Sequence, residues 1–313
     1  MIPSQRDVQQ AFDRVRPHVH QTPVLTSRLL DELSGASIFF KCENFQKMGA
    51  FKMRGAINAI LQIPLADRAK GVITHSSGNF AQAVSLAAKN LGIPAYIVMP
   101  NNAPQVKKDA VISYEGIIYE SEVTIAAREA MASHIQKKSG ATFLHPSNHI
   151  DVILGQGTAA IELLKEQPSL HSIITPVGGG GLLAGSALAA KYYGSYMDVY
   201  AGEPFNADDG YRSLQSGKIE YNTTVNTIAD GLRTHLGDKN FPIIKTLVTD
   251  IIRVEEQEII AAMKLLWERL KIIIEPSCAV PFAALLKDKK TFAGKKVGII
   301  LSGGNVDLTN LPF

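Results

Sequence analysis

Short apolar runs that alternate with helix-like segments constrain the fold of this chain more than any other feature. Some of these runs end directly at a turn residue, such as Pro100, Gly178 or Ser302, as is typical of buried strands. The expected strands are residues 38–42, 71–74, 95–99, 116–119, 142–144, 172–177, 198–202 and 297–301. The expected helices include residues 81–90, 103–113, 123–138, 157–167, 181–193, 258–270 and 280–286. Strands that alternate with helices predict parallel sheets joined by right-handed crossovers.

The size and composition of the chain favour a globular protein with two domains. At about 150 residues per domain, 313 residues correspond to roughly two. Apolar residues make up 46% of the chain and charged residues 19%, which supports a sizeable core and excludes global disorder. The 32 basic and 29 acidic residues leave a net charge of +3 without a long basic run. No nucleic-acid or membrane-surface partner is therefore expected.

The number of cysteines and the lack of an evident targeting signal indicate in which cellular compartment the protein is expected. The two cysteines, Cys42 and Cys278, are too few for a disulfide scaffold or a cysteine-rich zinc module. The first residues do not resemble a signal peptide, and no apolar run approaches the roughly 20 residues of a membrane span. The sequence thus predicts a cytoplasmic protein.

A lysine stands in an apolar setting within residues 44–56. Lys52 lies between Phe51 and Met53, after a glycine turn and at the start of an expected helix. Burial and a helix N-terminus both disfavour the ammonium form, so a lysine in this position can act as a neutral amine nucleophile. Most lysines are solvated at the protein surface, and the segment alone leaves that alternative open.

A run of four glycines follows an apolar strand and precedes a helix. It consists of Gly178, Gly179, Gly180 and Gly181. Glycines let backbone N–H groups converge on an anion, and the helix dipole adds a favourable potential. The run is neither a GxGxxG dinucleotide motif nor a P-loop, because no Gly-Lys-Ser or Gly-Lys-Thr follows. A flexible turn is the alternative, but the position between strand and helix favours a phosphate site.

Two further turns carry polar side chains at strand ends. Residues 75–82 read His-Ser-Ser-Gly-Asn-Phe-Ala-Gln, and residues 301–305 read Leu-Ser-Gly-Gly-Asn. Hydroxyl and amide groups beside the free N–H groups of a helix start form a pocket suited to a carboxylate. Either turn alone would be an ordinary helix cap.

Together these four segments resemble those of fold type II pyridoxal-phosphate enzymes, and most closely the branch of serine racemases and catabolic serine/threonine dehydratases. The similarity extends from Thr-Pro-Val-Leu-Thr-Ser at 22–27 to Ser-Gly-Gly-Asn-Val-Asp at 302–307. It implies a two-domain α/β fold like that of tryptophan synthase β, in which each domain is an open, mostly parallel twisted sheet flanked by helices. The large, cofactor-binding domain would comprise residues 1–70 and 149–313, and the small mobile domain residues 71–148.

The resemblance also implies how the cofactor, pyridoxal 5′-phosphate, is held. Lys52 would attach it covalently, and the four glycines 178–181 would bind its phosphate. Asn79 would hydrogen-bond the ring hydroxyl, and Ser302 would meet the ring nitrogen. The other implied neighbours of the ring are Phe51 and Glu275.

The hydroxyl of Ser302 bears on the type of reaction. A neutral group at the ring nitrogen leaves the ring a weaker electron sink than a carboxylate would. Elimination suits a weak sink because the β-hydroxyl departs as the α-proton leaves, whereas transamination is disfavoured. The resemblance therefore implies an ammonia-lyase that converts L-serine to pyruvate or L-threonine to 2-oxobutyrate, with Lys52 as general base.

Two residues leave the substrate and the stereochemistry open. Ser77 aligns with the second acid/base of serine racemases, on the opposite face of the cofactor, but could instead only bind carboxylate or cap the helix. Arg128 aligns with an arginine near the substrate, and its helix offers no carboxylate three or four residues away. An inward-facing guanidinium would favour L-threo-3-hydroxyaspartate as substrate, whereas an outward-facing one would be an ordinary surface group. The implied substrate-binding residues are Ser76, Ser77, Asn79, Phe80 and Arg128.

A divalent cation, a nucleotide and a partner subunit are further implications of the resemblance. Glu203 and Asp209 would give carboxylate oxygens, and Ala207 its carbonyl, to Mg²⁺, Mn²⁺ or Ca²⁺. A solvated acidic loop is the alternative. A homodimer is expected, and ATP is implied by the residues at matching positions, which are Ser27, Lys47, Gln82, Tyr114, Lys271 and Asn305.

Three departures from the family pattern fall near the expected site. Phe80 replaces a histidine beside the carboxylate pocket, Met48 replaces a hydroxyl residue, and Ala50 replaces a serine near the lysine. From a different functional class, the chain could be a catalytically silent amino-acid or nucleotide sensor that retains the fold. A visible absorbance band of lysine-bound cofactor, together with turnover, would separate enzyme from sensor.

Overall fold

Two sheets organise the computed structural model, which describes residues 2–313. The strands are β1 (Val24–Leu25), β2 (Ser37–Cys42), β3 (Val72–His75), β4 (Ala95–Pro100), β5 (Ile117–Ser121), β6 (Thr142–Phe143), β7 (Ser172–Pro176), β8 (Asp198–Pro204), β9 (Asp250–Val254) and β10 (Lys296–Leu301). The α-helices are α1 (Gln5–Val15), α2 (Arg28–Ser34), α3 (Lys52–Gln62), α4 (Leu65–Arg68), α5 (Asn79–Asn90), α6 (Gln105–Ser113), α7 (Ile125–Ser139), α8 (Ile150–Glu166), α9 (Gly181–Tyr193), α10 (Asp209–Ser216), α11 (Phe241–Leu247), α12 (Glu256–Leu270), α13 (Pro276–Lys287) and α14 (Lys289–Phe292). Short 3₁₀ helices span Arg16–His18, Glu43–Phe45, Lys47–Gly49, Phe205–Ala207 and Asp230–Leu232.

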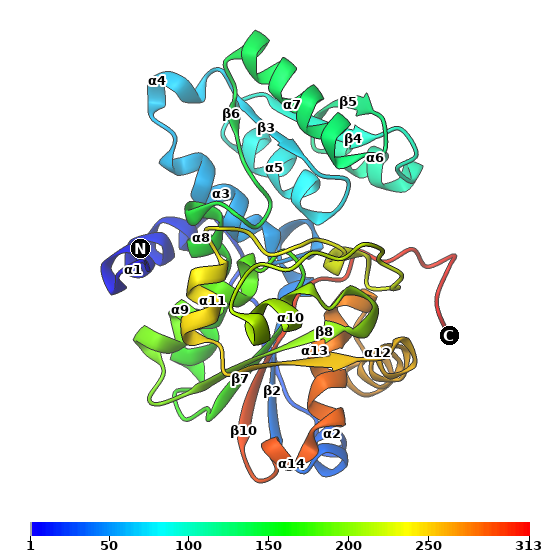
Figure 1. The fold of residues 1–313 in the computed structure, drawn as a ribbon. Coiled ribbons are helices and arrows are strands. Elements are labelled where there is room, and N and C mark those ends of the chain that lie inside the picture. The colour runs from blue at the N-terminus through cyan, green and yellow to red at the C-terminus, as the bar shows by residue number, and fades with distance from the viewer. Residues whose placement is uncertain (1) are drawn as a thin grey trace.

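The six-stranded sheet forms the lower lobe in Figure 1 and has the strand order β1-β2-β10-β7-β8-β9. Only β1 runs antiparallel to its neighbour, and the other pairs are parallel. The early strand β2 pairs with the late strand β10, with Ser37 opposite Lys296 and Cys42 opposite Leu301. This lobe is therefore built from both ends of the described chain.

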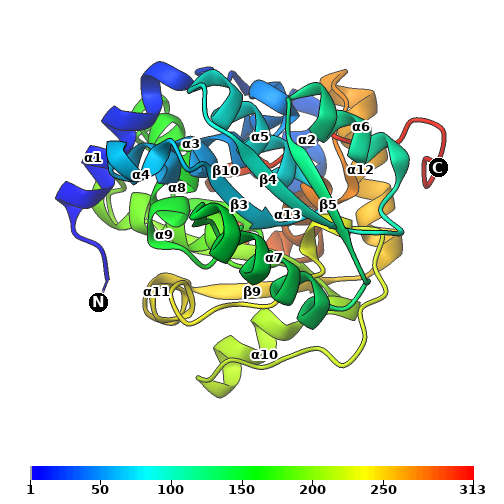
Figure 2. The ribbon, with the colours of Figure 1, turned by 90° about the horizontal axis from the view of Figure 1, so that it is seen from above.

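The four-stranded sheet forms the upper lobe, with the all-parallel order β5-β4-β3-β6. Figure 2 shows helices α5 and α7 on opposite sides of β3 and β4, both of which they contact. Two mostly parallel sheets flanked by helices confirm the predicted fold class. The residue ranges of a separately moving small domain stay a prediction.

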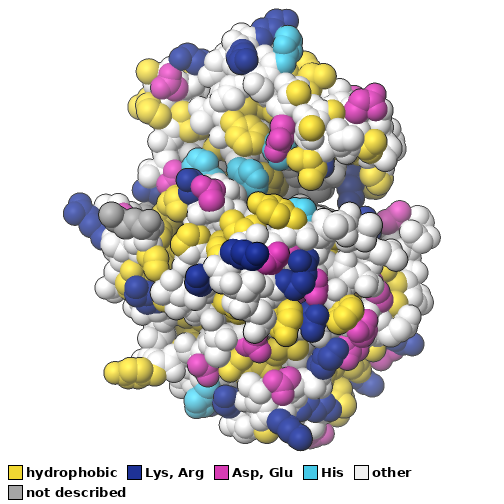
Figure 3. Space-filling model, viewed as in Figure 1, with side chains coloured by type: hydrophobic (Ala, Val, Ile, Leu, Met, Phe, Trp, Pro, Cys, Tyr) yellow, Lys and Arg dark blue, Asp and Glu magenta, His cyan; other side chains and the backbone are white. Residues whose placement is uncertain are grey.

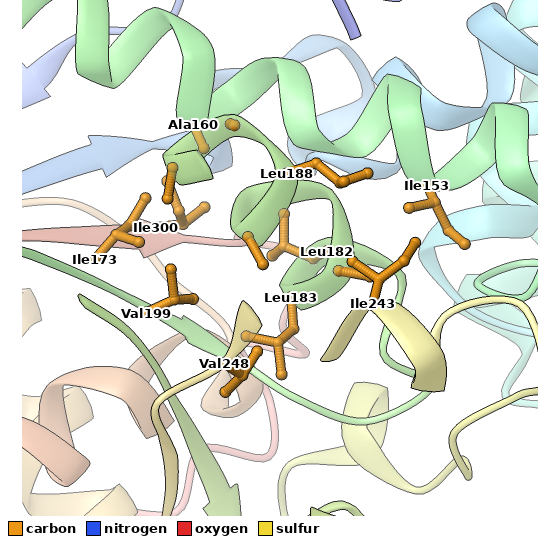
Figure 4. Packing of buried hydrophobic residues seen from close by; sticks show 14 of the residues in the cluster. Ile153, Ala160, Ile173, Leu182, Leu183, Leu188, Val199, Ile243, Val248 and Ile300 are labelled. Carbon is orange, nitrogen blue, oxygen red and sulfur yellow. The ribbon is translucent and has the colours of Figure 1, made fainter. Parts of the chain in front are cut away.

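Glycines let the central helices of the lower lobe approach closely. A Cβ atom at Gly157 of α8 would lie 2.4 Å from the carbonyl oxygen of Gly185 of α9, and one at Gly185 would lie 2.4 Å from that of Ile153. Apolar side chains from α8, α9 and the strands pack together in one buried cluster (Figure 4). Burial of such apolar side chains stabilises a fold by roughly 25 cal/mol per Å² removed from water.

Helix α3 connects the lobes. Met53 and Ile57 share a buried apolar cluster with Phe80 and Val84 of α5, while α3 also packs along α8. Within residues 2–313, no helix combines the length and apolar character needed to cross a bilayer.

Several predicted bounds were wrong. The helix expected from residue 157 begins at Ile150, and the helix expected from residue 280 begins at Pro276, where a proline without an N–H is tolerated in the first turn. The glycines of α8 do not break the helix, because they are sites of helix–helix contact. Strand β9 and helices α10 and α11 were not expected from the sequence.

Candidate active site

Lys52 begins helix α3 at the junction of the two lobes. Its Nζ donates a hydrogen bond of 2.9 Å to the carbonyl oxygen of Pro146, and it lies 4.9 Å from the ring centroid of Phe51 and 5.8 Å from that of Phe80. Burial lowers the pKa of Lys52 to about 8, although the Glu275 carboxylate opposes this shift. Part of the amine is therefore neutral at physiological pH, as a nucleophile requires.

The turn before Lys52 is held by the segment that follows β10. Phe51 N–H donates to the carbonyl oxygen of Ser302 at 3.0 Å, and Asn305 Nδ2 donates to that of Met48 at 2.9 Å. Met48 has a φ of 55°, and Gly49 follows with a φ of 77°. A non-glycine residue rarely adopts this left-handed conformation, so these bonds hold an unfavourable turn in the shape that presents Lys52.

The four glycines form the loop between β7 and α9, as predicted. Gly180 has a φ of 78° and caps α9. A Cβ atom would lie 2.4 Å from Ser147 Oγ at Gly179, and 2.6 Å from a methyl of Leu236 at Gly180. Among the hydrogen bonds of residues 2–313, none has the N–H of residues 178, 179, 180 or 181 as its donor. A buried loop with free N–H groups at a helix start suits a phosphate.

The peptide Pro146-Ser147 joins the lysine to the glycine loop. The carbonyl oxygen of Pro146 accepts hydrogen bonds from both Lys52 Nζ and Gln156 Nε2. Asn240 Nδ2 donates to the carbonyl oxygens of Ser147 and Gly179, at 3.1 and 2.8 Å. The lysine and the glycine loop are thus parts of one site.

Sequence reasoning missed Ser147, Gln156 and Asn240. Each of these residues is distant in sequence from the site residues that it contacts, and hydrophobic periodicity does not reveal such long-range contacts. For Ser147 a signal existed, since it follows a predicted strand, and the carboxyl ends of parallel strands line binding crevices.

Asn79 and Glu275 form a polar contact between the lobes. Asn79 Nδ2 donates to both carboxylate oxygens of Glu275, while Asn79 Oδ1 accepts from Asn305 Nδ2. Burial raises the pKa of Glu275 to about 7, although the hydrogen bond from Asn79 opposes this. Ser302 is also buried at this edge of the sheet. The predicted ring contacts at residues 79, 275 and 302 therefore lie around Lys52.

The residues predicted to form a carboxylate pocket lie at the start of helix α5 and in the turn before it. Ser76, Ser77 and Asn79 are partly exposed there. The ring of Phe80, in contrast, is buried in the apolar cluster beside Lys52. This chain thus places an apolar ring beside Lys52, where the resemblance described above leads to the expectation of a histidine.

Histidines gather where the two lobes meet, as Figure 3 shows. The ring of His75 stacks on Phe143, with centroids 5.3 Å apart, and meets His145 edge-on at 5.9 Å. His145 Nδ1 accepts from the N–H groups of Ser147 and Asn148, and burial lowers the pKa of His145 to about 4. The ring is therefore neutral, with its proton on Nε2.

Arg128 of α7 is partly exposed and lies close enough to this histidine group for its charge to act on it. Its positive charge, after burial, is a cause of the lowered pKa of His75. Its Nε is buried and has no hydrogen-bond partner among the described residues. A guanidinium with an unused donor beside the site can bind an anionic group of a substrate.

The predicted cation ligands lie together on the lower lobe. Glu203 and Asp209 are both fully buried. Burial and the neighbouring Asp209 carboxylate raise the pKa of Glu203. Glu203 accepts from the N–H groups of Gly210 and Tyr211. Within residues 2–313 no group of three His, Cys, Asp or Glu side chains could hold a metal, so a cation here would need carbonyl oxygens or waters in addition.

The six predicted nucleotide residues are spread over several elements. Lys47 Nζ donates to the carbonyl oxygen of His18, Lys271 is exposed at the end of α12, and Tyr114 packs against an apolar cluster. No hydrogen bond among the described residues joins any two of the set Ser27, Lys47, Gln82, Tyr114, Lys271 and Asn305.

Comparison with known proteins gives one consistent result. A family model described as "pyridoxal-phosphate dependent enzyme" matches residues 15–303. The beta-hydroxyaspartate dehydratase of Paracoccus denitrificans is 47% identical, over 100% of this chain and 99% of its own. The serine racemase of Arabidopsis thaliana is 49% identical, over 97% and 93%. The solved structure of a threonine deaminase from T.th. is 40% identical and has a TM-score of 0.93, covering 98% of this chain and 100% of its own.

Proposed function

This chain belongs to the family of pyridoxal-phosphate-dependent enzymes, and we propose that it is an ammonia-lyase acting on L-serine and L-threonine. The observation that carries the proposal is the joining of Lys52 and the glycine loop through Pro146-Ser147. An amine whose pKa is lowered to about 8 thereby lies in one site with a set of unpaired N–H groups. The products are pyruvate or 2-oxobutyrate and ammonia. The water lost from the β-carbon is regained when the carbon–nitrogen bond is hydrolysed.

The residues of the site fit the cofactor at both ends. The N–H groups of Gly178 to Gly181 would bind its phosphate, and Lys52 would hold its aldehyde end. Ser302 would meet the ring nitrogen, Asn79 the ring hydroxyl and Phe51 one ring face. Pyridoxal phosphate, when bound, supplies an electron-withdrawing ring that labilises bonds at the α-carbon of an amino acid.

The remaining steps use side chains of this chain. The N-terminal turn of α5, with Ser76 and Asn79, would bind the α-carboxylate of the substrate. Lys52 Nζ, once released, would remove the α-proton of an L-amino acid. The neutral hydroxyl of Ser302 disfavours a protonated ring nitrogen, and this favours elimination over transamination.

Serine racemisation is a second activity proposed for the same site. Ser77 lies in the turn between β3 and α5 and is partly exposed. Racemisation requires a second group that exchanges a proton on the face opposite Lys52, and we propose Ser77 for this role. The Arabidopsis relative named serine racemase supports it.

A specific observation also favours L-threo-3-hydroxyaspartate as an alternative substrate. The buried Nε of Arg128 lacks a partner among the described residues, and the charge of Arg128 acts on His75 near the site. A second carboxylate would satisfy this donor with a charge-assisted hydrogen bond. The Paracoccus relative is named as a dehydratase of beta-hydroxyaspartate.

A cation, a nucleotide and a second subunit complete the proposal. Two buried carboxylates, Glu203 and Asp209, with the carbonyl of Ala207, suit a structural Mg²⁺, Mn²⁺ or Ca²⁺ ion. The predicted nucleotide residues come from several elements and would bind ATP at an interface between the subunits of a homodimer. A reducing cytoplasm suits the two free, buried cysteines.

A substrate panel tests the proposed function. The loaded protein is incubated with L-serine, D-serine, L-threonine and L-threo-3-hydroxyaspartate, and keto acid and enantiomers are measured together. Pyruvate from L-serine supports the ammonia-lyase, and D-serine from L-serine supports the role of Ser77. Bound cofactor without turnover of any of the four would favour the silent sensor.

A further inference from the structure

Four charged side chains form a buried network behind the candidate site. They are Lys41, Glu43, Arg54 and Glu162, whose side chains are 0%, 0%, 0% and 7% exposed. Arg54 lies 2.7 Å from Glu43 and 2.8 Å from Glu162, and Lys41 lies 2.7 Å from Glu162. Two cations and two anions make the network neutral.

Arg54 is the centre of this network. Its Nε and one terminal nitrogen donate to the two oxygens of Glu43. The terminal nitrogens also donate to the two oxygens of Glu162, both at 2.8 Å. Thr158 Oγ1 accepts a further bond at 3.3 Å. One guanidinium therefore bridges two carboxylates, which the planar fork of arginine permits and a lysine ammonium does not.

The network is joined to the reactive lysine through the first turn of α3. Arg54 is two residues after Lys52, in the first turn of α3, whereas Glu43 follows β2 and Glu162 lies on α8. The backbone is held as well, because a Cβ atom at Gly155 of α8 would lie 2.4 Å from the carbonyl oxygen of Arg54. The start of α3 is thus fixed to both β2 and α8.

Helix α8 also determines what Lys52 contacts. Gln156 of α8 donates to the same Pro146 carbonyl oxygen that accepts from Lys52 Nζ. Gln156 also lies against the glycine loop, since a Cβ atom at Gly181 would lie 2.4 Å from its Oε1. A shift of α3 along α8 would therefore displace Lys52 from both Pro146 and the glycines.

We propose that Arg54 is a positioning residue for Lys52, and that the network fixes the amine at the distance from the glycine loop that the cofactor spans. This inference rests on the proposed function, in which Lys52 holds the cofactor. Stability alone is a poor explanation of the network, because the desolvation of buried charges offsets their attraction, and apolar residues of similar volume are often as stable. What four ionic groups add is a defined geometry at the start of α3.

Two matched double variants of the full chain test this. Glu43→Gln with Arg54→Met removes one cation and one anion, and leaves Lys41 paired with Glu162. Lys41→Met with Glu162→Gln removes the other pair, and leaves Arg54 bound to both oxygens of Glu43. Each variant buries the same number of charges, so thermal unfolding should be shifted similarly.

The readouts are the release rate of pyridoxal phosphate on dilution and the pH dependence with which an acylating reagent labels Lys52 in cofactor-free protein. The variant lacking Arg54 is expected to release the cofactor about 10- to 100-fold faster, as for a catalytic group misplaced by about 1 Å. The pH at which Lys52 is half-labelled should also differ between this variant and the wild type. The variant that retains Arg54 should stay within about threefold, because Arg54 still donates to both oxygens of Glu43 and the amide oxygen introduced at position 162 can still accept one of its hydrogen bonds. Equal release from both variants, or wild-type behaviour without Arg54, would overturn the proposal.

Arg54→Lys provides the test if the first double variant does not fold. It retains the charge but loses the bridge between Glu43 and Glu162, so an intermediate release rate is expected, and a wild-type rate would contradict the proposal.

Lys52→Ala distinguishes a failure of the proposed function from a failure of the positioning role of Arg54. A lysine-bound cofactor band that persists in Lys52→Ala defeats the proposed function itself. Loss of that band, with normal release from the variant lacking Arg54, defeats only the positioning role.

Discussion

Asn79 of the upper lobe donates from Nδ2 to both carboxylate oxygens of Glu275 of the lower lobe, at 2.9 and 3.1 Å. The contact crosses the junction that holds Lys52, and Glu275 is one of the charges that act on that lysine. Burial raises the pKa of Glu275 to about 7, so this link between the lobes titrates near neutral pH.

Glu275 is expected to make the stability of the protein depend on pH. Its folded pKa of about 7 exceeds the ordinary value of 4.5, so the folded state binds more protons than the unfolded state between these values. The contribution of the Glu275 carboxyl to the free energy of unfolding is therefore fully present below pH 4.5 and is lost as the pH rises to about 7. Thermal unfolding of Glu275→Gln should show a flatter profile over this range. Glu268→Gln, at an exposed position of α12, is the control, and an unchanged slope in Glu275→Gln would contradict the assignment.

The glycine loop should not tolerate even a methyl group. In Gly179→Ala the new Cβ would lie 2.4 Å from Ser147 Oγ and 3.0 Å from Thr234 Oγ1. Affinity for pyridoxal phosphate, measured by fluorescence titration, should fall by at least about tenfold, which is about 1.4 kcal/mol. Gly92→Ala is the control, because a Cβ atom at Gly92 would have no other atom within 4 Å, despite a φ of 66°. Equal affinity in the two variants would argue against a phosphate site here.

Arg128 is expected to determine preference between substrates. Removal of a charged hydrogen bond costs about 1.5–3 kcal/mol, so kcat/KM for L-threo-3-hydroxyaspartate should fall about 10- to 150-fold in Arg128→Ala. The value for L-serine, which lacks a second carboxylate, should change little. Lys137→Ala, an exposed cation on the same helix, should affect neither substrate. An equal loss for both substrates would show that the guanidinium does not bind the second carboxylate of L-threo-3-hydroxyaspartate.

Removal of divalent cations should lower the thermal stability of the lower lobe. A cation that binds only the folded state stabilises it by about 2.7 kcal/mol at 100 times its dissociation constant. A chelator should therefore lower the unfolding temperature, and Mg²⁺, Mn²⁺ or Ca²⁺ should restore it. Asp209→Asn is expected to abolish the response, whereas Asp67→Asn, whose side chain is 49% exposed, should retain it. Indifference of the wild type to chelation would count against the site at Glu203 and Asp209.

Local signals carried most of what the sequence predicted correctly. Helix α9 spans Gly181–Tyr193, as expected, because a glycine loop starts it and an apolar pattern continues through it. The apolar neighbours of Lys52 and the strand-to-helix turn around Asn79 were likewise visible in short segments. Such features depend on adjacent residues, which a sequence displays directly.

Features that depend on distant contacts were not predicted. Asn240, at the start of α11, supports the glycine loop at a separation of 61 residues from Gly179, a placement that only the packed fold determines. An isolated glycine weakens a helix, yet close packing against α3 and α9 keeps Gly155 and Gly157 within α8. The bridge from Arg54 to Glu43 and Glu162 likewise depends on three segments that meet only in the folded chain.

The most direct test of the central claim is to locate the covalent attachment of the cofactor. The loaded protein is reduced with borohydride and digested, and the peptides are mapped by mass spectrometry. The phosphopyridoxyl group is expected on Lys52 alone, and Lys52→Ala should carry none. Modification of another lysine, or of none in a protein that has bound pyridoxal phosphate, would contradict the account.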